Sequence, residues 1–136
     1  MKKIIETVAL IHIKGKKLLL VRPKSKKIFY MPGGKPDDGE DNLKALVREI
    51  KEEVNVDIDP KTIAFYGVFE AQAYGKDKGM MVRVHCYTAN HSGNIQSSSE
   101  IDEVAYFSYA EYVDGLDPAP AVKLILEDLK KKGLVE

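Results

Sequence analysis

Several things are scarce in this sequence, and each absence excludes a class of protein. The 136 residues include one cysteine and no tryptophan, and 21 basic and 21 acidic residues give a formal net charge of zero. With Cys86 alone, the chain cannot form an internal disulfide, and it has no Cys/His cluster of the kind that holds zinc. The balanced charge creates no overall field that attracts nucleic acid or an anionic membrane. This composition predicts a reducing compartment, the cytoplasm.

Long apolar segments are also missing. The longest unbroken apolar runs span about four residues, whereas a membrane-spanning helix needs about 20. Near the N-terminus, Glu6, His12 and Lys14 interrupt the apolar stretch, and no small-residue cleavage site follows. We therefore expect neither a signal peptide nor a membrane span. The length predicts one domain, residues 1–136.

The residues that are present alternate between two hydrophobic periods. Short segments rich in β-branched, aromatic and leucine residues, separated by turn-like stretches such as KGKK and PKSKK, predict strands within residues 6–34, 62–75, 80–90 and 103–109. Apolar residues at helical spacing predict helices over residues 41–54 and 120–133. The expected fold class is α+β, an α/β/α sandwich with a mixed central sheet and helices on both faces.

The first predicted helix has marked ends and one apolar stripe. Asp41 is suited to be its N-cap, and Asn55 stands where a left-handed C-terminal residue is usually needed. The stripe is formed by five residues at helical spacing: Leu43, Leu46, Val47, Ile50 and Val54.

Three glutamates, Glu49, Glu52 and Glu53, border this stripe. Like charges at such spacings repel by a few tenths of a kcal/mol per pair. A solvated, charge-rich helix face is the ordinary explanation of such a cluster. A magnesium site is the alternative, because a hard cation takes carboxylate oxygens and keeps positions for water and phosphate. Arg48 can reach Glu52 or Glu40, and its planar guanidinium would fix a carboxylate in one orientation.

The stretch from residue 34 to residue 56 resembles the Nudix box. Eight of its nine fixed positions match at the correct spacing: Gly34, Glu40, Arg48, Glu49, Ile50, Glu52, Glu53 and Val56. The departure is Asn55, where the family usually has glycine; asparagine also enters the left-handed region at low cost, so the turn should survive. The chain is therefore identified as a member of the Nudix hydrolase family, similar to its MutT-like branch.

This resemblance implies a Nudix-type sandwich that hydrolyses a nucleoside diphosphate linked to another group, using Mg²⁺ or Mn²⁺. It implies that Glu49, Glu52 and Glu53 bind the metal, which activates the attacking water. We expect a nucleoside triphosphate pyrophosphohydrolase. Hydrolysis of ADP-ribose, a nucleotide sugar or a dinucleoside polyphosphate stays open, as does a non-catalytic nucleotide-binding module. The intact set of box carboxylates favours an enzyme.

Four residues outside the helix complete the predicted site. Gly33 and Gly34 either let the backbone approach phosphates closely or form a simple turn. Arg22 matches the arginine that often ends the second strand in this family and contacts a substrate phosphate. Glu100 is the predicted general base, because three serines before it make a mobile segment that could bring it to the metals, with Glu49 as the alternative.

The expected partner is a small-molecule nucleotide, with neither nucleic acid nor a membrane, and a homodimer stays open. His12, His85 and His91 show no ligand spacing, so none enters the predicted site. Four aromatic residues are candidates to stack a base, although aromatics in strands more commonly belong to the core: Phe29, Tyr30, Phe69 and Tyr74.

Overall fold

The computed structural model describes residues 3–136. Its strands are β1 (Lys3–Leu10), β2 (Ile13–Lys14), β3 (Lys17–Pro23), β4 (Gly33–Gly34), β5 (Asp57–Ile58), β6 (Ala64–Gln72), β7 (Met80–Thr88), β8 (His91–Ser92) and β9 (Ile101–Phe107). Its helices are α1 (Asn42–Val54), α2 (Tyr109–Val113) and α3 (Pro120–Lys131), with a short 3₁₀ turn, η1 (Pro60–Thr62). No helix within residues 3–136 is long and apolar enough to cross a membrane.

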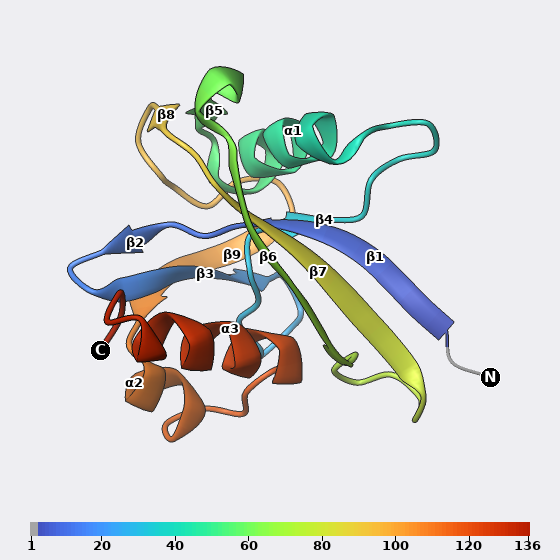
Figure 1. The fold of residues 1–136 in the computed structure, drawn as a ribbon, viewed down its shortest axis with the longest axis vertical. Coiled ribbons are helices and arrows are strands. Elements are labelled where there is room, and N and C mark those ends of the chain that lie inside the picture. Colours follow the sequence, from blue (N-terminus) through green and yellow to red (C-terminus); the bar gives the residue numbers. More distant parts are fainter. Residues whose placement is uncertain (1–2) are drawn as a thin grey trace.

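Helices cover both faces of the central strands. Helix α1 lies on one side, and α2 and α3 lie on the other (Figure 1). The strands form a four-stranded sheet in the order β4-β1-β7-β6 and a three-stranded sheet in the order β2-β3-β9, while β5 pairs with β8. Strands β1 and β7 are parallel, whereas β4 and β6 pair antiparallel to their neighbours. This confirms the predicted sandwich and its mixed sheet.

Alternate side chains of β1 separate two apolar cores. Val8 and Leu10 pack with the buried side chains of α1, whereas Ala9, and Ile11 directly after β1, belong to the core that includes α3. This alternation is the two-residue period of a strand that is covered on both faces. It holds β1 rigidly between the two helical layers, so an element paired to β1 has a fixed position.

The ends of α1 agree with the sequence. The Asp41 carboxylate accepts a hydrogen bond from the Lys44 N–H at 2.8 Å, and Asn55 adopts the left-handed conformation with φ of 59°. The predicted apolar stripe is wrong at Leu43, which is 46% exposed. Leu43 lies in the first turn, and the buried side chains of α1 begin only at Ala45.

Helix α2 departs from the sequence prediction. The pattern predicts a strand through residue 109, but β9 ends at Phe107 and Ser108 caps the next helix. The Glu111 N–H donates to Ser108 Oγ at 3.2 Å, and the Ser108 N–H donates to Glu111 Oε1 at 3.0 Å. This reciprocal cap follows the Ser-x-x-Glu spacing that starts many helices, a signal that the strand-like aromatic residues obscured.

Candidate functional site

The glycine pair of β4 lies between β1 and the glutamate-bearing helix. Gly33 and Gly34 pair antiparallel with Ala9 and Val8, and α1 packs against them. A Cβ atom on Gly33 would lie 1.9 Å from the Val8 carbonyl oxygen, and one on Gly34 would lie 2.7 Å from the Glu49 carboxylate. Gly33 also has a φ of +142°, which side chains rarely tolerate. Position 33 therefore requires glycine to pair with β1, whereas a side chain at position 34 would displace the flexible Glu49 carboxylate.

Glu53 points from α1 toward this glycine pair. The Gly33 N–H donates a hydrogen bond to Glu53 Oε1 at 2.9 Å. Burial raises the pKa of Glu53 to about 8, although the Gly33 bond opposes the shift, and the charges of Glu49 and Glu52 add to it. Burial also raises the pKa of Glu49. Neighbouring carboxyl groups with raised pKa values are typical of functional sites, and a nearby cation would lower these values.

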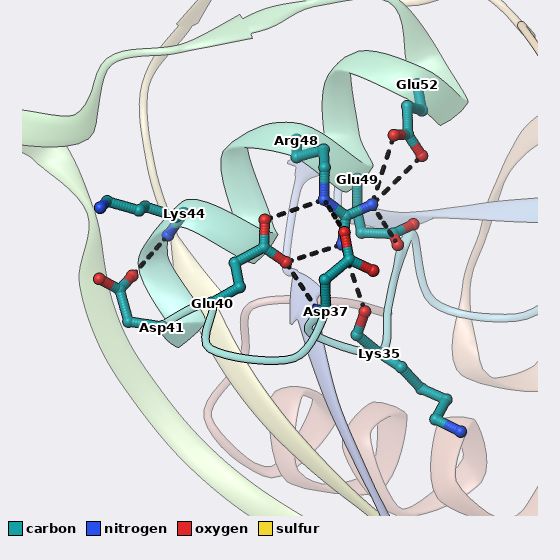
Figure 2. A network of polar contacts seen from close by, with 8 residues as sticks. All are labelled: Lys35, Asp37, Glu40, Asp41, Lys44, Arg48, Glu49 and Glu52. Carbon is teal, nitrogen blue, oxygen red and sulfur yellow. Dashed lines mark hydrogen bonds and ion pairs between the residues drawn. The ribbon is translucent and has the colours of Figure 1, made fainter.

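Arg48 binds three of the box glutamates at once (Figure 2). Its Nε and Nη2 donate to the two oxygens of Glu40 at 2.9 and 2.8 Å. Its Nη1 donates to Glu49 at 3.0 Å and to Glu52 at 3.3 Å. The hydrogen bonds from Arg48 lower the pKa of Glu40 to about 2. The two-point contact with Glu40 fixes the guanidinium plane, so Arg48 orients Glu49 and Glu52 from a stable position.

The loop before α1 joins the same network. Arg48 Nη2 donates to the Lys35 carbonyl oxygen at 3.3 Å, and Arg48 Nε lies 3.4 Å from Asp37 Oδ2. The Asp37 N–H in turn donates to Glu40 Oε1 at 2.9 Å. Sequence reasoning missed Asp37, because no helical or strand spacing links it to Arg48. The loop is thereby tied to the helix face that carries the glutamates.

The donor chemistry of Glu49, Glu52 and Glu53 fits a hard divalent cation, which prefers carboxylate oxygens. In residues 3–136, however, no three Asp, Glu, His or Cys side chains are gathered as a ready metal site. Arg48 holds Glu49 and Glu52, while Glu53 accepts from the backbone. The Glu52 side chain is 50% exposed, so it can turn away from Arg48 without disturbing the core.

Arg22 lies on β3 and is paired with acidic residues of β9. Its Nη2 donates to Asp102 at 2.9 Å, and its Nε donates to Glu103 at 3.3 Å. It also donates to the Lys26 carbonyl oxygen at 3.1 Å. A phosphate would have to compete with these two carboxylates, so the substrate-binding role of Arg22 stays a prediction.

Glu100 lies in the turn before β9. Its carbonyl oxygen accepts from the Lys24 N–H at 2.8 Å. Within the described residues, no hydrogen bond or ion pair joins its side chain to the box glutamates. The loop that carries it is nevertheless attached to α1, since the Ser98 N–H donates to the Glu53 carbonyl oxygen at 3.0 Å. Its role as general base also stays a prediction.

A cavity of about 300 Å³ opens beside the glycine pair. Gly33 and Gly34 form part of its wall, and most of the other lining residues are apolar or aromatic. Tyr30 and Tyr74 line it with their rings edge to face at 6.4 Å between centroids, and the Tyr74 hydroxyl donates to Asp117. The other two aromatic candidates belong to the core, with Phe29 buried and Phe69 packed against it.

Solved structures share this fold. The solution structure of the E. coli ORF135 protein is 26% identical to this chain with a TM-score of 0.72, and the match covers 96% of this chain and 94% of that one. A MutT NUDIX hydrolase from Burkholderia pseudomallei is 19% identical with a TM-score of 0.74, covering 93% and 98%. An ADP-ribose pyrophosphatase from Streptococcus suis is 21% identical with a TM-score of 0.58, covering 92% and 86%. No curated protein matches the sequence.

A model of the NUDIX domain matches residues 3–127, so the chain belongs to the Nudix family. This confirms the expectation of a Nudix hydrolase, an enzyme that acts on phosphoanhydride bonds, and solved MutT proteins share its fold. Members of this family act on small nucleotide substrates and generally use divalent metal ions.

Proposed function

We propose that residues 1–136 form one domain that hydrolyses a nucleoside triphosphate to a nucleoside monophosphate and pyrophosphate, with Mg²⁺ or Mn²⁺. One observation carries this proposal: the cavity and the glutamate helix share the same glycine pair. Gly33 and Gly34 line the cavity, Gly33 donates to Glu53, and Gly34 leaves the space that the Glu49 carboxylate fills. A ligand with its aromatic end in the cavity would therefore direct its charged end toward the glutamates.

The cavity favours one nucleoside over two. Its volume of about 300 Å³ is at the small end of ligand pockets, which span roughly 300–1,000 Å³. Tyr30 and Tyr74 offer aromatic surface for a base. Lys26 and Lys76 also line the cavity and are exposed, so they lie at its open side, where they would attract a polyphosphate chain.

The residues of the chain divide the chemistry between them. Glu49, Glu52 and Glu53 would hold the metal, which when bound neutralises phosphate charge and makes water more acidic. Arg48 keeps Glu49 and Glu52 oriented, and its contact with Glu40 holds the guanidinium in place. The Gly33 N–H fixes one oxygen of Glu53. Because phosphoryl transfer depends mainly on charge neutralisation and positioning, these contacts supply most of what the reaction needs from the protein.

Glu100 is the proposed general base, since three metal-bound carboxylates retain little capacity to accept a proton. The Glu100→Gln variant should lower kcat much more than Glu103→Gln and leave substrate affinity nearly unchanged. Glu103 is a matched control, because it belongs to the same segment but is paired with Arg22. Equal kcat values near wild type for both variants would eliminate Glu100 and leave Glu49 as the base.

The substrate is tested with a panel of nucleoside triphosphates, ADP-ribose, nucleotide sugars and dinucleoside polyphosphates. Each is incubated with Mg²⁺, Mn²⁺ or EDTA, and nucleotide products, phosphate and pyrophosphate are measured separately, because cleavage of the other three classes releases nucleotides but neither inorganic anion. We expect metal-dependent release of pyrophosphate from a triphosphate. Turnover of only ADP-ribose, a nucleotide sugar or a dinucleoside polyphosphate would show that the proposed substrate class is wrong. Nucleotide binding without turnover of any compound would indicate a nucleotide-binding module in place of the proposed enzyme.

A further inference from the structure

A second cavity, of about 370 Å³, lies away from the glycine pair and shares no residue with the first. Its walls come from β2, β8, β9 and the segments next to them, which lie on one side of the fold (Figure 1). The lining residues are His12, Lys14, His91, Gly93, Asn94, Ile95, Val104 and Tyr106. The proposed function uses none of them.

Two histidines that are far apart in the sequence meet at this cavity. The rings of His12 and His91 lie edge to face with 5.1 Å between their centroids. The Tyr106 ring lies 5.9 Å from His12. The sequence gives no ligand spacing for these histidines, so only the pairing of distant strands brings them together. Together they place two imidazoles and a phenol around one hollow.

The charged and polar side chains at this cavity are suited to an anion. Lys14 and Asn94 are exposed hydrogen-bond donors, and no acidic residue of the described chain lines the cavity. Within residues 3–136, neither side chain has a hydrogen-bond or ion-pair partner, whereas Lys17 and Lys51 pair with carboxylates at 3.0 and 3.4 Å. Two imidazoles alone make an incomplete metal site, and the Lys14 charge would repel a cation.

The electrostatics of His12 agree with this geometry. Burial lowers the pKa of His12, and the charges of His91 and Lys14 lower it further. The titratable groups that face it are Lys14 on β2, His91 on β8 and Tyr106 on β9; burial raises the pKa of Tyr106, which keeps this phenol neutral. An anion placed among these groups would offset their mutual repulsion and favour the charged imidazoles.

We infer that this cavity is a second ligand site, which binds a phosphate-type oxyanion through Lys14, His12 and His91. Free phosphate, pyrophosphate and the phosphate groups of a nucleotide share this chemistry. The inference does not depend on the proposed function, because the two sites have no residue in common.

The imidazole NMR signals of the full-length, metal-free protein test this inference. Inorganic pyrophosphate is titrated in at constant ionic strength, and the pH titration of each histidine is then repeated. We expect saturable shifts of the His12 and His91 signals, with the apparent pKa of His12 raised by about one unit. His85 is the internal control, because it is paired with Glu6 at 2.8 Å on another sheet. No saturable shift, or an equal response of His85, would overturn the site.

Two variants then separate the cavity from general charge attraction. Lys14→Gln should weaken pyrophosphate binding about tenfold, the loss of one charge-assisted hydrogen bond. Lys16→Gln removes a charge of the same sign from the adjoining turn, outside the cavity. This variant should therefore bind pyrophosphate with the wild-type affinity. Equal weakening by both variants would show non-specific attraction and reject the inference.

The source of the anion is decided by repeating the titration with inorganic phosphate and with a nucleoside monophosphate. Equal affinities for the two compounds indicate a site for free anions, and tighter binding of the nucleotide indicates a nucleotide phosphate; either result supports an oxyanion site. A titration with Zn²⁺ completes the test. Saturable shifts of His12 and His91 with Zn²⁺ but none with any phosphate compound would replace the anion site with a metal site.

Discussion

Helices α1 and α3 cover opposite faces of the same strands, yet they place their acidic residues differently (Figure 1). The buried side chains of α3 are all apolar: Ala121, Val122, Ile125, Leu126 and Leu129. Its Asp128 lies at the rim, where it accepts from the Tyr66 hydroxyl at 2.6 Å and pairs with Lys132 at 3.1 Å. On α1, by contrast, Glu53 turns inward to the backbone of Gly33.

This difference agrees with the proposal that α3 serves stability and α1 serves a ligand. Asp128 meets a donor and a cation of the protein itself, so its charge is satisfied without any other molecule. On α1, several acids share the cation Arg48, and within residues 3–136 Glu53 has no cation among its hydrogen-bond and ion-pair partners. Like charges at these spacings oppose helix formation. The proposed divalent cation would offset this repulsion.

The largest expected effects on turnover and stability come from one substitution on α1 and one on α3. Glu53→Gln should lower kcat at least about 10²-fold and change folding little, because glutamine keeps an acceptor for the Gly33 N–H. Leu126→Ala on α3 should do the reverse, losing about 2–5 kcal/mol of stability while the folded fraction keeps its kcat. Turnover at saturating Mg²⁺ and urea unfolding measure both quantities. A kcat near the wild-type value in Glu53→Gln would show that Glu53 is not a metal ligand, and the proposed difference between α1 and α3 would then fail.

Substitutions of the two glycines beside α1 separate effects on stability from effects on activity. Gly33→Ala places a Cβ against the Val8 backbone at an unfavourable φ, so we expect a stability loss of about 3 kcal/mol. Gly34→Ala meets only the flexible end of Glu49, and should cost less than about 1 kcal/mol while lowering kcat about tenfold. Urea unfolding and steady-state kinetics distinguish the two. If Gly34→Ala keeps full activity, the position of the Glu49 carboxylate does not matter for the reaction.

Arg48→Lys should lower kcat about tenfold, because an ammonium cannot reproduce the planar two-point contact with Glu40 or hold Glu49 and Glu52 together. Lys132→Gln is the matched control, since it breaks the rim ion pair with Asp128 and should leave kcat unchanged. Steady-state assays at several Mg²⁺ concentrations measure both variants. Wild-type kcat in Arg48→Lys would exclude an orienting role.

A further effect is a dependence of stability on pH in the metal-free protein. The pKa of Glu53 rises from 4.5 to about 8 on folding, so between these values the folded state holds a proton that the unfolded chain has released. Its contribution to stability should therefore fall as pH rises through this window. Asp128 has the opposite sign, because its hydrogen bond from Tyr66 lowers its pKa and the stability is lost as pH falls.

Urea unfolding in EDTA at a series of pH values measures this dependence. Glu53→Gln should remove most of the decline between about pH 4.5 and pH 8, with Glu49 supplying the rest, and leave the acid limb to which Glu40 and Asp128 contribute. An unchanged decline in this variant would assign the slope to another group.

Much of the candidate site was predictable, because its signals are local. The caps Asp41 and Asn55 and the box spacing depend on residues within one helix, where separations of three and four determine which side chains meet. The sequence predicted that Arg48 can reach Glu52 or Glu40; the structure shows both contacts and adds Glu49. The contacts of Arg22 with Asp102 and Glu103 have no such local signal, because they depend on how β3 pairs with β9.

The sequence by itself determined the strand and helix periods, the ends of α1 and the set of acids on its face. Only the tertiary structure decided that Leu43 stays exposed, that Glu53 meets Gly33 and that His12 meets His91. The physical reason is the range of the forces involved: caps and helical spacing act between near neighbours in the chain. Which distant residues meet depends instead on strand register and on the layers that bury the apolar faces.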